Sequence, residues 1–265
     1  MDLTAGVLTR VLAVCHGAEP SEPAETVLVL RQEQPSFAAT VFAAWRAEGA
    51  ALNPALAFEV DAQLARLRTY RELAAVITAR EPGVLPVKGL EVADLYPDGI
   101  PRHMNDLDYV ATDERALWRL ARGLVDDGWD LHVATFCLLR ERLHVVVCLR
   151  RPHEDPFQLP YGVEVSSYAS LGDLAGVPPV VRPPASWRDP VVKNLTMLLF
   201  ERFEQPFRAR DVLDAALLLA ARGDDGSAVH AEVDRLGLWP EYGELVALLD
   251  AAGLDRPPGP ADRPL

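Results

Sequence analysis

The sequence has few cysteines, no long apolar run and no excess of basic residues. Its three cysteines, Cys15, Cys137 and Cys148, are odd in number and show no C-x-x-C spacing. This excludes a disulfide framework or a zinc knuckle and indicates small buried apolar side chains. No stretch of about 18 uninterrupted apolar residues occurs, and the N-terminus carries Asp2 and Arg10 where a signal peptide has a basic start and an unbroken apolar core. We therefore expect a soluble cytoplasmic protein without a membrane partner.

Acidic residues outnumber basic ones, 39 to 26, and the formal net charge is −13. Such a balance disfavours a long nucleic-acid track, which needs basic residues to neutralise phosphates. A nucleotide is still compatible with it, because a metal ion can supply positive charge locally. With 265 residues, of which 49% are hydrophobic, the chain is expected to fold around a real core as one large domain or two modest ones.

Helical periodicity marks both ends of the chain. Residues 4–14, 25–32 and 37–46 predict short helices, and a long helix is expected after the turn at Asn53-Pro54. Four more helices are expected from Pro190 onward, with Gly223 as one helix end. The last ten residues are rich in proline and predict a flexible tail.

The middle of the chain alternates between strand and helix patterns. "VLPV" and "DLDYVA" read as strands, a helix is expected over residues 89–96, and another over 112–129 with Thr112 as its N-cap. "DLHVATFCLL" and "LHVVVCLRR" predict a hairpin, with "YGVEVSSYA" as a strand beside it. The predicted fold class is α/β (α+β), a small mixed sheet flanked by helical segments. Its expected parts are a helical lobe (1–82), the α/β core (83–188), a C-terminal helical domain (189–255) and the tail (256–265).

Two aspartates one residue apart open the second predicted strand. Alternate residues of a strand share a face, so Asp106 and Asp108 point the same way. Like charges held together need neutralisation, and a magnesium ion is the common biological solution. Glu164 in "YGVEVSS" would complete the metal site, or take a proton from an attacking hydroxyl, if its strand lay beside the pair.

Basic and flexible residues precede the acid pair. Gly89 after a strand lets the backbone approach a phosphate, and Lys88 adds a point charge. Arg102, on a loop marked by prolines, is expected to reach the same phosphates with its planar guanidinium. Further along, Arg210 and Asp214 lie one helical turn apart and predict an ion pair.

The stretch "VKGLEVADLYPDGIPRHMNDLDYVA" resembles the core of the uncharacterised nucleotidyltransferase family within the polymerase-beta-like nucleotidyltransferase superfamily. The shared pattern is a strand ending in Lys-Gly, a helix ending in Tyr-Pro, an arginine, then Asp-x-Asp opening a strand, with a later acid on a strand. The resemblance covers residues 85–166 well and the helical flanks only loosely. Gly89 is followed by Leu90, whereas the broader superfamily has serine or glycine there.

The resemblance implies transfer of a nucleoside monophosphate from a nucleoside triphosphate, with ATP expected, to an acceptor with release of pyrophosphate. Asp106, Asp108 and Glu164 would be the catalytic acids that bind Mg²⁺ or Mn²⁺. Lys88, Gly89 and Arg102 would hold the triphosphate, and Lys193 on a helical wall of the cleft would add a phosphate contact. A small molecule or a protein is the expected acceptor, and the fold alone does not choose between them.

Two other interpretations stay open. A protein with this fold can bind nucleotide without catalysis and dock a partner through its acidic surface. Transfer onto an RNA end fits the acidic balance poorly, and a compact basic patch around the cleft would favour it.

Overall fold

The structure is a computed structural model that describes residues 1–17, 20, 22–139, 141–170, 177–222 and 226–254. Two expectations, a helix end at Gly223 and a tail over 256–265, lie outside these residues. No helix among those described is long and apolar enough to cross a membrane. The elements in chain order are α1 (Ala5–His16), α2 (Pro23–Gln32), α3 (Pro35–Ala47), α4 (Pro54–Arg80), β1 (Val84–Val87), α5 (Leu90–Ala93), β2 (Asp106–Ala111), α6 (Glu114–Asp126), β3 (Asp130–Leu139), β4 (Arg142–Arg151), β5 (Tyr161–Ser166), a 3₁₀ helix (Ala185–Arg188), α7 (Pro190–Glu201), α8 (Ala209–Arg222), α9 (Ser227–Leu236) and α10 (Trp239–Ala251).

The chain divides into two compact units. The first, the helical unit, contains residues 1–67, 92–103 and 188–265, and the second, the sheet unit, contains residues 68–91 and 104–187. The N-terminal and C-terminal helices therefore belong to one unit, although the whole central sheet separates them in sequence. One boundary falls inside α4.

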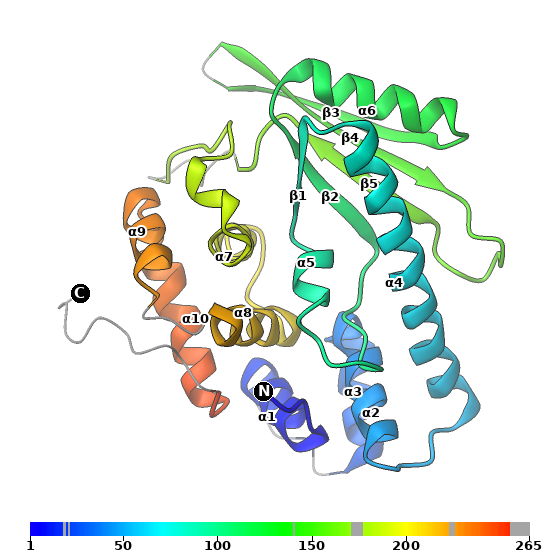
Figure 1. The fold of residues 1–265 in the computed structure, drawn as a ribbon. Coiled ribbons are helices and arrows are strands. Elements are labelled where there is room, and N and C mark those ends of the chain that lie inside the picture. Colours follow the sequence, from blue (N-terminus) through cyan, green and yellow to red (C-terminus); the bar gives the residue numbers. More distant parts are fainter. Residues whose placement is uncertain (18–19, 21, 140, 171–176, 223–225, 255–265) are drawn as a thin grey trace. The chain divides into compact units, whose positions relative to one another are not determined.

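The sheet unit is built on five strands in the order β1-β2-β5-β4-β3 (Figure 1). β2 and β5 run parallel, and every other neighbouring pair is antiparallel. β3 and β4 form the predicted hairpin, and β5 lies beside β4 as expected. The predicted fold class, a mixed α/β sheet with helical flanks, is confirmed.

One face of the sheet is covered by α6 (Figure 1). Leu107, Val163 and Leu149 lie in register on this face and are buried. The N-cap of α6 is Asp113, whose carboxylate accepts a hydrogen bond from the Ala116 amide, so the prediction of Thr112 was wrong. Thr112 is occupied elsewhere, since its amide and its hydroxyl both donate to the Gly83 carbonyl.

The short helix α5 ends earlier than predicted. It covers only Leu90–Ala93, and the chain then continues as a turn in which the Leu95 and Tyr96 amides donate to carbonyls three residues back. Pro97 explains why the helix does not reach Tyr96, because a proline disfavours helical backbone at the residue before it.

The helical unit buries its own core around α7 and α8. Both are almost entirely buried from Val192 to Phe200 and from Asp211 to Leu219. α7 begins as expected with Pro190 at its first turn, where the missing N–H costs nothing, and Asp189 caps it through the Val191 and Val192 amides.

Candidate active site

Two of the three acids predicted to act together, Asp108 and Glu164, lie on one row across the sheet. Asp108 is the register partner of Glu164 on the parallel neighbour β5, and Glu164 is in turn the partner of Cys148 on β4. Residues directly opposite each other in a sheet project from the same face. The strand adjacency on which the role of Glu164 depends is therefore present, and these three side chains share the face opposite α6.

Asp106 lies two residues before Asp108 and hence on the same face. It is solvent-exposed, and its register partner on β5 is Gly162. A Cβ added at Gly162 would lie 3.0 Å from the Asp106 Cβ and 3.3 Å from the Asn105 carbonyl oxygen. Gly162 thus leaves the space that the Asp106 side chain occupies.

A buried tyrosine ties the starts of these two strands together. Tyr70 on α4 is fully buried, and its hydroxyl donates to the Asn105 carbonyl just before β2. The same hydroxyl accepts a hydrogen bond of 3.1 Å from the Gly162 amide of β5. One side chain therefore holds both strands where Asp106 faces Gly162.

Replacing Tyr70 with phenylalanine is expected to lower the free energy of unfolding by about 1–3 kcal/mol, because an N–H and a carbonyl lose their partner. Tyr109→Phe is the matched control, since the buried Tyr109 hydroxyl has no hydrogen-bond partner in the described part of the chain. Its removal is expected to be neutral or stabilising. Urea unfolding of both variants measures the difference, and equal midpoints would contradict the role given to Tyr70.

Cys148 donates a hydrogen bond to a carboxylate oxygen of Glu164, with 3.2 Å between Sγ and Oε2. Burial, together with the hydrogen bond to Glu164 and the charges of Glu164, Asp106 and Asp108, raises the pKa of Cys148 to about 12. The thiol is therefore protonated at neutral pH and is available as a donor. All three cysteines are partly exposed, so the expectation that they are buried was wrong.

The Lys88-Gly89 pair directly follows β1, whose last residue, Val87, is the register partner of Asp108. Both residues have positive φ, 59° at Lys88 and 50° at Gly89. Positive φ is uncommon for a residue such as lysine and is a feature that clusters at ligand sites. Gly89 is also restricted by space, because a Cβ there would lie 2.9 Å from the Met104 Cε.

Arg102 has a different environment from the one predicted. It lies in the helical unit, is 7% exposed, and its guanidinium donates to both Asp214 carboxylate oxygens at 2.7–3.0 Å. Burial alone would lower the Arg102 pKa, but the charge and hydrogen bonds of Asp214 outweigh it and the pKa is raised. The Tyr96 hydroxyl donates a hydrogen bond to the same carboxylate, with 2.7 Å between the hydroxyl oxygen and Asp214 Oδ1. Because its guanidinium is hydrogen-bonded to Asp214, Arg102 has a structural role in this environment. The predicted contact between Arg102 and a phosphate is not supported.

The pairing expected between Arg210 and Asp214 is also not found. Arg210 contacts Asp211 at 3.4 Å, while Asp214 is engaged by Arg102. Lys193 lies on α7 of the helical unit with only 2% of its surface exposed. Its phosphate contact stays a prediction.

The donor set on the carboxylate face is the kind that magnesium prefers, because all three acids offer oxygen ligands. Neighbouring strands lie about 4.8 Å apart and residues two apart in a strand about 6.6 Å, so the backbones of Asp106, Asp108 and Glu164 are within side-chain reach of one ion. As the side chains stand, however, no group of three or more His, Cys, Asp or Glu residues in the described ranges could hold a metal ion. The strand register therefore places the three acids where they could reach one metal ion, but their side chains are not arranged around one.

Sequence reasoning missed Tyr70, Gly162 and Cys148. Gly162 carried a usable signal, because a glycine two residues before an acid in a strand leaves room on the same face. No local signal marked Tyr70 as a site residue, since it lies in a long helix among other candidate core residues. Cys148 was interpreted only as a small apolar residue.

Comparison of the chain with protein-family models and with curated proteins finds no match.

Proposed function

We propose that this protein is a metal-dependent nucleotidyltransferase that moves a nucleoside monophosphate from a nucleoside triphosphate to a small-molecule or protein acceptor. One observation carries the proposal: Asp108 and Glu164 are register partners on parallel strands, with Asp106 on the same face. Three acids on one sheet face repel one another, and a bound divalent cation would offset that repulsion.

The bonds that change are those at the α-phosphorus. The acceptor oxygen forms a bond to phosphorus while the bond between the α-phosphorus and the bridging oxygen breaks, and pyrophosphate leaves with that electron pair. Glu164 accepts the proton from the acceptor hydroxyl. Cys148, which donates to Glu164 Oε2, restrains the carboxylate in one orientation.

Asp106 and Asp108 would hold Mg²⁺ or Mn²⁺, with Glu164 as the third ligand, and the ion when bound offsets the negative charge of the phosphates. The positive φ values at Lys88 and Gly89 bring their backbone into a turn beside Asp108, and such turns direct N–H groups towards anions. Lys88 adds a cation to this end of β1.

The proposal is tested by supplying ATP, CTP, GTP and UTP in turn with Mg²⁺ or Mn²⁺ and measuring binding by calorimetry and pyrophosphate release by a coupled assay. Candidate acceptors are sugars, alcohols and proteins with exposed hydroxyls. Metal-dependent binding with pyrophosphate release supports the transferase. Absence of nucleotide binding under all of these conditions contradicts it.

A second candidate function is a nucleotide-binding scaffold without catalysis. It is favoured by the finding that, in the described segments, the acids are not grouped as a complete metal site. Binding of a triphosphate without pyrophosphate release for every acceptor class is the result expected of such a scaffold.

A further inference from the structure

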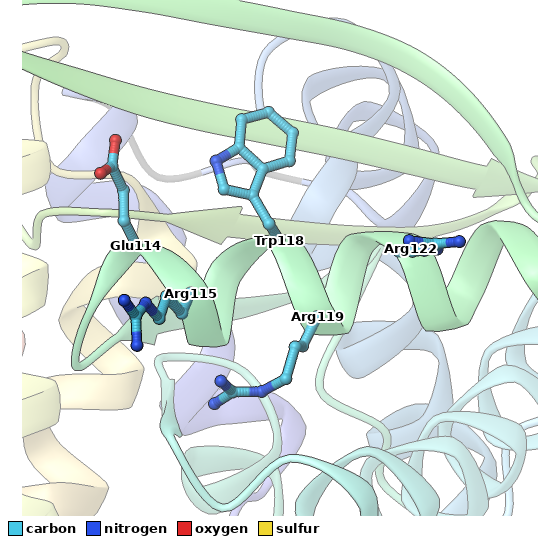
Figure 2. A pocket seen from close by; sticks show the side chains of 5 residues that line it. All are labelled: Glu114, Arg115, Trp118, Arg119 and Arg122. Atoms are coloured by element: carbon cyan, nitrogen blue, oxygen red, sulfur yellow. The ribbon is translucent and has the colours of Figure 1, made fainter.

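The outer face of α6 carries an exposed tryptophan among arginines, away from the carboxylate face. Trp118 is 43% exposed and lies in a pocket of about 440 Å³ (Figure 2). The five residues that line the pocket all come from α6: Glu114, Arg115, Trp118, Arg119 and Arg122. In a chain with a net charge of −13, three arginines around one indole form a local concentration of positive charge.

Arg119 is held in place from below the helix. Its guanidinium donates to both Glu81 carboxylate oxygens, at 2.6 Å and 3.0 Å. These hydrogen bonds are the main reason that the pKa of Glu81 lies below its usual range. In Figure 2 the Arg119 side chain projects from the side of α6 opposite Trp118. Arg119 is therefore already paired with a carboxylate and does not need a ligand.

Arg115 and Arg122 differ from Arg119, because within the described residues neither has a hydrogen-bond or ion-pair partner. They lie three residues before and four residues after Trp118, which are the spacings of neighbours on one helical face. Seven residues of helix separate them by about 10 Å. Along the helix axis, one cation therefore lies on each side of Trp118.

We propose that this surface, the Trp118 patch, binds a short acidic peptide segment of a partner protein, with carboxylates on Arg115 and Arg122 and an apolar side chain over Trp118. Arginine and tryptophan are enriched where partners bind, because a guanidinium matches a carboxylate in two hydrogen bonds and an indole buries a large apolar area. The inference is independent of the proposed nucleotidyl transfer.

A peptide fits better than a nucleic acid because of the charges at the helix ends. Asp113 and Glu114 lie at the N-terminus of α6, and Asp126 and Asp127 at its C-terminus. A nucleic acid carries a phosphate at every nucleotide and would meet these acids on both sides of the patch. A peptide can place its carboxylates only at the two arginines.

The test uses the fluorescein-labelled peptide Gly-Ser-Glu-Leu-Ser-Glu-Ser-Gly, whose two glutamates lie about 10 Å apart in an extended chain. The same peptide with glutamine in place of both glutamates and a ten-nucleotide uridine RNA are the comparison probes, and fluorescence anisotropy is measured with the full chain. Binding of the acidic peptide is expected to weaken about tenfold in Trp118→Ala and at least as much in Arg115→Glu with Arg122→Glu. The matched control is Arg142→Glu with Arg150→Glu, two exposed β4 arginines, which are expected to change affinity less than twofold.

Should the glutamate pair lower the unfolding midpoint, Arg115→Gln with Arg122→Gln replaces it, with an expected loss of about threefold. Three results overturn the proposal: no acidic-peptide binding at millimolar protein, equal loss in the β4 control, or tighter RNA binding with the same dependence on Trp118. A fourth such result comes from light scattering. If the protein is a dimer and Trp118→Ala dissociates it, a second copy of the chain and not a peptide occupies the Trp118 patch.

Discussion

Replacing Asp106 and Asp108 together by asparagine is expected to reduce pyrophosphate release at least about 100-fold, the loss typical when a group that stabilises transition-state charge is removed. Asparagine keeps the size of each side chain but lacks the negative charge that holds a divalent cation. Mn²⁺-dependent binding of a nonhydrolysable ATP analogue should fall in parallel. The measurement is calorimetry of the metal and analogue, followed by the pyrophosphate assay.

The control for this variant removes two other acids from the sheet unit. Asp126 and Asp130 are exposed and lie at the end of α6 and the start of β3. Asp126→Asn with Asp130→Asn changes the net charge equally and is expected to leave binding and turnover within about twofold, as for surface substitutions away from such a site. If both double variants behave alike, long-range charge and not a metal site explains the loss.

Replacing Arg102 by methionine is expected to lower the free energy of unfolding by about 3–5 kcal/mol. Its partner Asp214 has a side chain only 3% exposed, so loss of the guanidinium leaves a buried, uncompensated carboxylate that still accepts a hydrogen bond from the Tyr96 hydroxyl. Urea unfolding measures the effect. Adding Asp214→Leu to the variant should restore part of the stability, because the unpaired charge is removed with its partner.

The loss of stability in Arg102→Met is compared with the loss in a variant at an exposed ion pair. Arg46→Met is the control, because Arg46 and Asp61 form an exposed pair worth about 0–1 kcal/mol. A loss of stability for Arg102→Met that matches the control would contradict the structural role of Arg102.

Local signals in the sequence predicted most of the elements. Asn53-Pro54 does mark the start of α4, where the Asn53 side chain accepts from the Leu56 amide, and alternation between apolar and polar residues located β2 and β5. The error at Thr112 arose where a contact from outside the element decided the result, whereas the limit on α5 follows from Pro97, a local signal. Thr112 is engaged by Gly83, 29 residues away, and periodicity cannot report such a partner.

In the candidate site, too, local sequence patterns predicted some features, whereas contacts between residues distant in sequence were not predictable. Period-two spacing was enough to put Asp106 and Asp108 on one face, and strand order then brought Glu164 beside them. Arg102 looked like a phosphate ligand because the loop that carries it ends next to the acids. Its actual partner, Asp214, is 112 residues further along the chain, and nothing in either local sequence indicates the pair.

The most direct measurement is anomalous diffraction from a crystal soaked with Mn²⁺ and a nonhydrolysable ATP analogue. A manganese peak within coordination distance of Asp106, Asp108 and Glu164 oxygens, with triphosphate oxygens completing the shell, is the predicted result. Nucleotide bound elsewhere, or no peak on this face of the sheet at saturating Mn²⁺, would contradict it.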